Sequence, residues 1–292
     1  MKRLIALLML LALLLCACDS EEKTQPSTKP IATEVSYTGE NGETIFERSN
    51  NVCLFENDAC SLTLMKAEID SLSDYCWDVT LVNRTENAQI FTFKRAYLNE
   101  FDFDPLWVQR VEAGQTLETS IIWQYPEMEK RGIMQITRVD FNLCVYEADV
   151  AENVIANTDI TVFPSTKSAH IDYLRARETT DIDVVENEFY KFTIVGYDGD
   201  SRWGKELQVY AANNDEFRVV FRLENVTVND QPCDPQWSYT LDGGKQGYSS
   251  IVWFDSALQE LEIDGNLEFE DDLVICDEND TVLERVSHTF VP

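Results

Sequence analysis

Asp104-Pro105-Leu106-Trp107 and Asp234-Pro235-Gln236-Trp237 are two versions of one motif, and they lie 130 positions apart (104 to 234). The same offset brings identical residues onto each other: Val79 and Val209, Asn83 and Asn213, Phe91 and Phe221, Asn99 and Asn229, Gly114 and Gly244, Trp123 and Trp253. A constant offset over a long span is the signature of an internal repeat. The chain is therefore predicted to contain one structural unit twice.

Within each copy, apolar and polar residues alternate over short runs. The odd positions from Leu117 to Trp123 share one apolar face, and so do Val139, Phe141, Leu143 and Val145. A period of two residues predicts half-buried strands. About seven short strands in roughly 110 residues are typical of an immunoglobulin-like sandwich. The expected fold is all-β, with two tandem immunoglobulin-like β-sandwiches.

The apolar phase slips at the same place in both copies. It is odd at Phe91 and Phe93 and even at Ala96 and Leu98, and the second copy repeats the slip at the offset of the repeat. Because side chains alternate strictly along a strand, a slip predicts a β-bulge or a change of sheet.

The chain begins with Lys2 and Arg3, followed by an apolar run from Leu4 to Leu15. A basic start and a short apolar core indicate a secretory signal peptide, expected over residues 1–17. The run is shorter than the roughly 20 residues that a membrane-spanning helix needs. A plain secretory signal, with Cys18 an ordinary thiol, is the alternative to the lipoprotein interpretation given next.

Leu15-Cys16-Ala17-Cys18 resembles the lipobox of bacterial lipoproteins. The resemblance implies that Cys18 carries acyl chains and anchors the protein to the outer face of the cell membrane. The polar stretch that follows is expected to be a flexible tether over residues 18–50. The predicted domains are residues 51–164 and 186–292, joined by a linker over 165–185 that could hold a short helix at 169–175.

The composition is strongly acidic, with 53 Asp and Glu against 23 Lys and Arg and a net charge of −30. Nothing here neutralises phosphates, which excludes nucleic acid as a partner. Glu100, Asp102 and Asp104 alternate before a proline, so they could gather a calcium ion, although no EF-hand spacing occurs. No cofactor is expected.

Six cysteines follow the predicted signal, and export permits disulfides. Cys233 and Cys276 stand where the first copy has Phe103 and Tyr146, so a contacting pair in one copy could be a covalent pair in the other. Cys233–Cys276 is therefore the candidate disulfide. A small loop closed by Cys53 and Cys60, and free thiols throughout, remain alternatives.

The two tryptophans of the repeated motif, Trp107 and Trp237, follow an Asp-Pro turn where a strand is expected to begin. Core packing explains such rings, but an exposed turn also makes them candidate binding aromatics. The chain has neither a Gly-x-Ser-x-Gly elbow nor a His-Glu-x-x-His motif, and its only histidines are His170 and His288. No catalytic residues are predicted.

Both copies share an order of features: an Asn, Asp-Pro-x-Trp, a Gly turn, a Trp-ended strand and an acidic strand end. This order resembles uncharacterised immunoglobulin-like modules in surface lipoproteins of Gram-positive bacteria, especially gut Firmicutes. The resemblance implies the fold and a surface location, and it brings no catalytic residues.

Together these features predict a lipid-anchored cell-surface protein with two modules that bind a protein or glycan ligand. One alternative is a surface hydrolase that uses a carboxylate pair. The other is an accessory binding subunit of a transport or secretion system.

Overall fold

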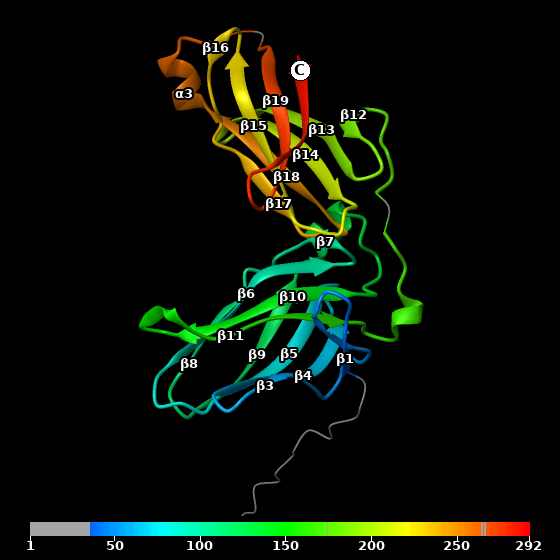
Figure 1. Ribbon diagram of the computed structural model, residues 1–292, viewed down its shortest axis with the longest axis vertical. Helices are drawn as coiled ribbons and strands as arrows, with labels where there is room; N and C mark the ends of the chain where they lie inside the picture. Colours follow the sequence, from blue (N-terminus) through cyan, green and yellow to red (C-terminus); the bar gives the residue numbers. More distant parts are fainter. Residues whose placement is uncertain (1–35, 174, 264, 266) are drawn as a thin grey trace, which may run out of the picture. The chain divides into compact units, whose positions relative to one another are not determined.

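The strands of the computed structural model follow the predicted repeat (Figure 1). The structure describes residues 36–173, 175–263, 265 and 267–292. In this part of the chain the helices are α2 (Tyr125–Lys130), α3 (Asp255–Glu260) and a 3₁₀ turn, η1 (Lys167–Ala169). The prediction of an all-β fold is confirmed.

The first sandwich packs a four-stranded sheet against one end of an eleven-stranded sheet. The smaller sheet has the order β3 (Val52–Glu56), β4 (Cys60–Ile69), β5 (Tyr75–Asn83), β9 (Thr116–Trp123). The larger sheet begins with β1 (Ser36–Thr38), β2 (Thr44–Phe46), β11 (Val150–Val162), β10 (Val139–Glu147), β6 (Gln89–Leu98), β7 (Phe101–Asp102). A further strand, β8 (Val108–Val111), pairs with β6.

The second sandwich is formed by the other end of the large sheet and a five-stranded sheet. The large sheet continues with β18 (Lys245–Phe254), β14 (Gly204–Asn213), β13 (Tyr190–Ser201), β12 (Ile182–Glu186). The five-stranded sheet has the order β16 (Gln231–Pro232), β15 (Val219–Val228), β19 (Phe269–Asp277), β20 (Val282–Phe290), with β17 (Ser238–Leu241) paired to β15.

The repeat extends to the element boundaries. β6, β7, β8, α2 and β10 correspond to β15, β16, β17, α3 and β19, with both ends of each element shifted by the offset of the repeat. Trp123 Nε1 donates to the Phe103 carbonyl at 2.9 Å, and Trp253 Nε1 donates to the Cys233 carbonyl at 3.0 Å. Both tryptophans are fully buried in their own cores. The same indole bond thus ties the motif segment to the core in each copy.

The phase slip is a bulge inside one strand. In β6, Phe93 pairs with Leu143 and Arg95 pairs with Asn142, so Lys94 has no partner on β10. The register of β15 against β19 shifts at the corresponding place, after Glu224. The predicted bulge is confirmed, and it lets both halves of the strand face the core.

Two expectations need correction. The last part of the predicted tether contains β1 and β2, and β2 pairs in parallel with β11 through the buried Ile45 and Phe46. A short apolar pair between polar turns gives no periodic signal, which is why the sequence pattern does not reveal it. In the connector the 3₁₀ turn η1 ends at Ala169, and residues 170–173 and 175 are not helical, where a short helix over 169–175 was expected.

All of these strands belong to one compact unit. None of the helices in the described residues is long and apolar enough to cross a membrane.

Candidate functional site

The two sandwiches meet where β7 lies beside β18. Phe101 of β7 and Gln246 of β18 are parallel partners, and the Gln246 N–H donates to the Glu100 carbonyl at 3.0 Å. This pairing carries the large sheet from one sandwich into the other. We call the contact region the junction; it comprises residues 95–102, 137–140, 170–173, 175 and 239–248.

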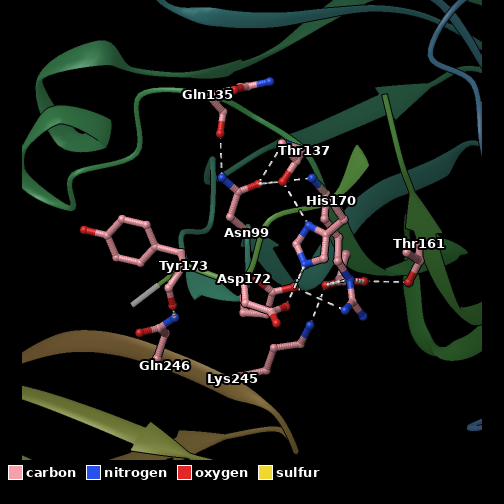
Figure 2. A network of polar contacts seen from close by, with 12 residues as sticks. Asn99, Gln135, Thr137, Thr161, His170, Asp172, Tyr173, Lys245 and Gln246 are labelled. Carbon is pink, nitrogen blue, oxygen red and sulfur yellow. Dashed lines mark hydrogen bonds and ion pairs between the residues drawn. The ribbon is translucent and has the colours of Figure 1, made fainter. Parts of the chain in front are cut away.

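A buried ion pair crosses the junction. Lys245 Nζ donates to Asp140, whose carboxylate also accepts from the Thr161 hydroxyl at 2.5 Å and from the Arg138 guanidinium at 2.9 Å (Figure 2). Burial acts to raise the pKa of Asp140, but Lys245 and Arg138 outweigh it, and the pKa is lowered. A buried carboxylate that keeps its charge requires both cations.

A turn at Asn99 shapes the first sandwich's side of the junction (Figure 2). Asn99 has a φ of 47°, and its side-chain oxygen accepts from the N–H groups of Thr137 at 2.8 Å and Arg138 at 3.1 Å. Its amide nitrogen donates to the Gln135 carbonyl at 2.6 Å. The Thr137 hydroxyl then lies 2.9 Å from His170 Nδ1, which fastens the connector to this turn.

Glu100 is the least well satisfied acid of the junction. Its Oε1 lies 3.2 Å from Arg138 Nη1 and 3.0 Å from His170 Nε2, while its Oε2 is buried without a hydrogen-bond partner. Burial raises the pKa of Glu100, and Arg138 and Lys245 oppose that rise only in part. The ionised form of Glu100 is therefore held at a cost.

An aromatic cluster lies beside these charges. The Phe101 ring lies 5.0 Å from the Tyr173 ring and 5.6 Å from the Tyr248 ring, measured between centroids. Gln246 Nε2 donates to the Tyr173 carbonyl at 2.9 Å, and its Oε1 accepts from the Tyr210 hydroxyl at 2.6 Å. Figure 2 shows Gln246 reaching the connector at Tyr173. The connector is therefore bound to both sandwiches.

Two tyrosine–carboxylate bonds cross the junction in opposite directions. Tyr97 of the first sandwich donates to Asp242 of the second at 2.9 Å, and Tyr239 of the second donates to Asp102 of the first at 2.8 Å. Burial raises the pKa of Asp102, and the bond from Tyr239 opposes the rise. Such reciprocal bonds fix the register of the two surfaces.

A groove borders the junction beside α2. It consists of two hollows of about 610 Å³ and 390 Å³ that share Glu127, Arg131 and Tyr248, and we call it the junction groove. One hollow is polar, with Lys130, Glu178, Gln208, Ser249 and Ser250. The other is more apolar, with Phe103, Pro105, Leu106 and Ile122. Both sandwiches and the connector contribute to its walls.

Leu106 is the most exposed large apolar side chain of the groove, at 85%. It has a φ of 53°, and its N–H bonds to Asp104 Oδ1 at 2.7 Å. In the second copy, Gln236 has a φ of 55° and makes the same bond to Asp234. The strained turn is thus structural, but the apolar side chain belongs to the first copy alone.

Arg131 lies between the two hollows. Its Nη1 donates to the carbonyl and to the carboxylate of Glu127, both at 2.9 Å, and its guanidinium stands 4.5 Å over the Phe103 ring. Its Nε is buried without a hydrogen-bond partner. The groove therefore presents a held cation beside an apolar surface.

A further cavity of about 290 Å³ borders the junction and is highly charged. Its four cations are all held by carboxylates: Arg95 and Arg218 by Asp242, Arg138 and Lys245 by Asp140. These charges join the sandwiches and leave no cation of this cavity's described lining free for a ligand.

The predicted binding aromatics are in the core. Trp107 is 6% exposed and packs on Phe93, with 5.0 Å between ring centroids. Trp237 is half-buried, packs edge-on against Phe192 and donates to the Ser249 hydroxyl at 3.0 Å. Core packing therefore accounts for Trp107, whereas Trp237 packs against the core with part of its surface exposed. Cys18, the predicted lipid attachment, lies outside the described residues.

The candidate disulfide is not formed. Cys233 and Cys276 are both free and buried, as are Cys60 and Cys144, and the half-buried Cys53 and Cys76 are also free. Cys233 packs in the core with Leu273 and Ile275, whereas Cys276 alternates with them on β19 and lies on the opposite face. The strand phase therefore separates the two thiols.

The alternating acids before Pro105 do not converge. Glu100 faces Arg138, Asp102 accepts from Tyr239, and Asp104 bonds to the Leu106 N–H. Among the described residues no group of three or more His, Cys, Asp or Glu is placed to hold a metal ion. The same bonds commit Asp102 and Asp104 to structure, although both line the groove.

Reasoning from the sequence missed the junction residues, yet a signal for them exists. Tyr239 and Tyr248 stand where the first copy has Gln109 and Glu118, and Lys245 replaces Gln115. Large or charged residues present in one copy of a repeat and absent from the other indicate a surface that only one copy uses.

No protein-family model matches the chain, and no curated protein matches it. Among solved structures, the Salmonella enterica SafA pilin in complex with the SafB chaperone is 10% identical, with a TM-score of 0.25 over 81% of this chain and 98% of the other. The partial N-terminal region of the enterococcal surface protein is 10% identical, with a TM-score of 0.23 over 82% and 95%. Red sea bream transglutaminase is 10% identical, with a TM-score of 0.24 over 81% and 31%. These scores are too low to transfer a function, and the β-sandwich fold is assigned from the chain's own strands.

Proposed function

We propose that this chain is a cell-surface interaction protein, anchored to the outer face of the membrane by lipid at Cys18, which binds a protein partner at the junction groove. The observation that carries the proposal is the groove itself. It is walled by both sandwiches and the connector, and it holds the exposed Leu106 next to Arg131. Walls supplied by packed strands suit binding because little ordering is needed when a partner arrives.

The partner proposed is an extended peptide segment. β9 is the last strand of its sheet in the order β3-β4-β5-β9, so one edge of it is available for main-chain pairing. Ile122, 46% exposed, lies on β9 and lines the groove next to Leu106. Strand addition at such an edge uses backbone hydrogen bonds for affinity and adjacent hollows for specificity. The peptide is expected to place an apolar side chain against Leu106 and a carboxylate near Arg131.

The test of the groove uses the soluble chain that begins at Asp19, with Leu106→Asp as the variant. A matched control is Val154→Asp, because Val154 is also an exposed apolar residue, on β11. Crosslinking on intact producing cells, followed by mass determination, should yield one adduct with the natural chain and the control. Loss of more than about tenfold is expected for Leu106→Asp, since an apolar contact is replaced by a desolvated charge. Equal adduct yields from all three chains would refute the groove as the binding site.

The anchor is tested separately by Cys18→Ser, with Cys16→Ser as its control. Cys18→Ser should release the protein into the medium, because one polar side chain replaces the lipid that holds it. Retention of Cys18→Ser at the membrane would refute the anchor and leave the groove proposal intact.

A further inference from the structure

The junction joins unlike ends of two like sandwiches. The first sandwich contributes the end that carries β7, and the second contributes residues 239–248, the end of β17, the turn after it and the start of β18, which we call its loop end. A contact between different surfaces of related modules is heterologous, and such contacts extend into filaments unless they are closed. The free end of the second sandwich corresponds to the β7 end of the first, and the free end of the first sandwich corresponds to the loop end of the second. The residues at these two free ends decide whether copies of the chain can join end to end.

The free end of the second sandwich has lost the docking side chains. At the offset of the repeat, Tyr97, Phe101 and Asp102 are replaced by Thr227, Gln231 and Pro232, respectively, and Asp140 is replaced by the longer acid Glu270. The ring that stacks on Tyr173 and Tyr248 is gone, and so is the carboxylate that accepts from Tyr239.

The free end of the first sandwich has lost the receiving side chains. The first-copy counterparts of Tyr210, Tyr239, Lys245 and Tyr248 are Thr80, Gln109, Gln115 and Glu118, respectively. Asp242, which accepts from Tyr97, corresponds to Glu112. An end-to-end contact between two chains would set Gln115 against Glu270, where the junction has Lys245 against Asp140. It would also set Glu118 against Gln231, where the junction stacks Tyr248 on Phe101, so both the ion pair and the ring contact are absent.

We infer that the loop end of the second sandwich is a receptor for one partner, the β7 end of a first sandwich, taken from its own chain or from a second copy whose junction is open. Within one chain the connector keeps the two surfaces at high effective concentration, so the closed monomer dominates. When the junction is opened, two chains exchange sandwiches and form a swapped dimer that satisfies both junctions.

A charge swap tests this inference on the soluble chain that begins at Asp19. Asp140→Lys and Lys245→Asp each place like charges across the junction of a single chain. When the two variants are mixed, both pairs are restored in trans. In one junction the lysine introduced into the first variant meets the aspartate introduced into the second, and in the other junction the natural pair forms. Each variant alone should be monomeric by light scattering, and the equimolar mixture should double in mass.

A second swap protects the test against misfolding. Arg95 and Asp242 lie 2.9 Å apart at the more exposed rim of the junction, so Arg95→Asp and Asp242→Arg disturb the cores less. Circular dichroism checks that each variant keeps its strands. A mixture that stays monomeric in both swaps would overturn the inference, and so would end-to-end association of the natural chain. Either outcome leaves the groove proposal to its own test, because both swaps are measured by the mass of the chain with no partner present.

Discussion

Asn83 and Asn213 occupy the same place in the two sandwiches and make the same three hydrogen bonds. The buried Asn83 amide donates to the carbonyls of Asn87, Val111 and Glu112 at 2.8, 3.0 and 3.1 Å. The buried Asn213 amide donates to the corresponding carbonyls of Phe217, Leu241 and Asp242 at 2.8, 3.3 and 3.1 Å. One side chain therefore pins two neighbouring loops to the end of a strand.

Replacing either asparagine with alanine should lower the free energy of unfolding by about 2–4 kcal/mol, because buried carbonyls lose their donor. Urea denaturation of Asn83→Ala and Asn213→Ala measures the loss. Asn214→Ala is the control, since Asn214 is exposed and its side chain donates to the Glu188 carbonyl at the longer distance of 3.4 Å. A loss at Asn213 no larger than at Asn214 would contradict the assignment.

Lys245→Met should destabilise the protein by about 3–5 kcal/mol, because it leaves the buried Asp140 without its main partner. Adding Asp140→Asn should recover most of that loss, since both charges are then absent. Denaturant unfolding measures both effects. Lys130→Met, which alters an exposed pair with Glu127, should change stability by less than about 0.5 kcal/mol. A double variant as unstable as the single one would contradict the prediction.

Asp102→Asn should raise the melting temperature at neutral pH, and the gain should shrink as the pH falls. The folded pKa of Asp102 is raised by burial, so folding favours its protonated form. The stabilisation of the folded state by protonated Asp102 is complete below the unfolded pKa, about 3.9, and is lost as the pH rises through the folded pKa. Asparagine keeps an acceptor for the Tyr239 hydroxyl without the charge. Melting curves from about pH 4 to about pH 7 test this; a gain independent of pH would refute it.

The soluble chain should titrate as six free thiols in denaturant without reductant. In the native state Cys53 and Cys76 should react first, because the other four thiols are buried. Burial also raises the pKa of both Cys60 and Cys76 to about 11, so the expected order of reaction rests on exposure and not on pKa. Time courses with a thiol reagent measure the total number of free thiols in denaturant and the number that react first in the native state. Fewer than six thiols in denaturant would establish a disulfide.

Local pattern accounts for much of the fold. The alternation around Trp123 and Val139 predicted strands, the slip after Phe93 predicted the bulge, and both follow from the two-residue period of side chains. The Cys233–Cys276 pairing failed on the same rule, since Cys276 is out of phase with Leu273 and Ile275. Applying strand phase to that pair would have excluded it.

The sequence by itself determined the duplication, the strands and the bulge, because each is written in neighbouring residues or in a constant offset. Only the tertiary structure decided that Lys245 meets Asp140 and that Gln246 pairs beside Phe101. The physical reason is that the alternation of apolar and polar residues along a strand shows that one face of the strand is buried. It does not show which other segment buries that face. The covering surfaces here are distant in the sequence, on positions where the two copies differ.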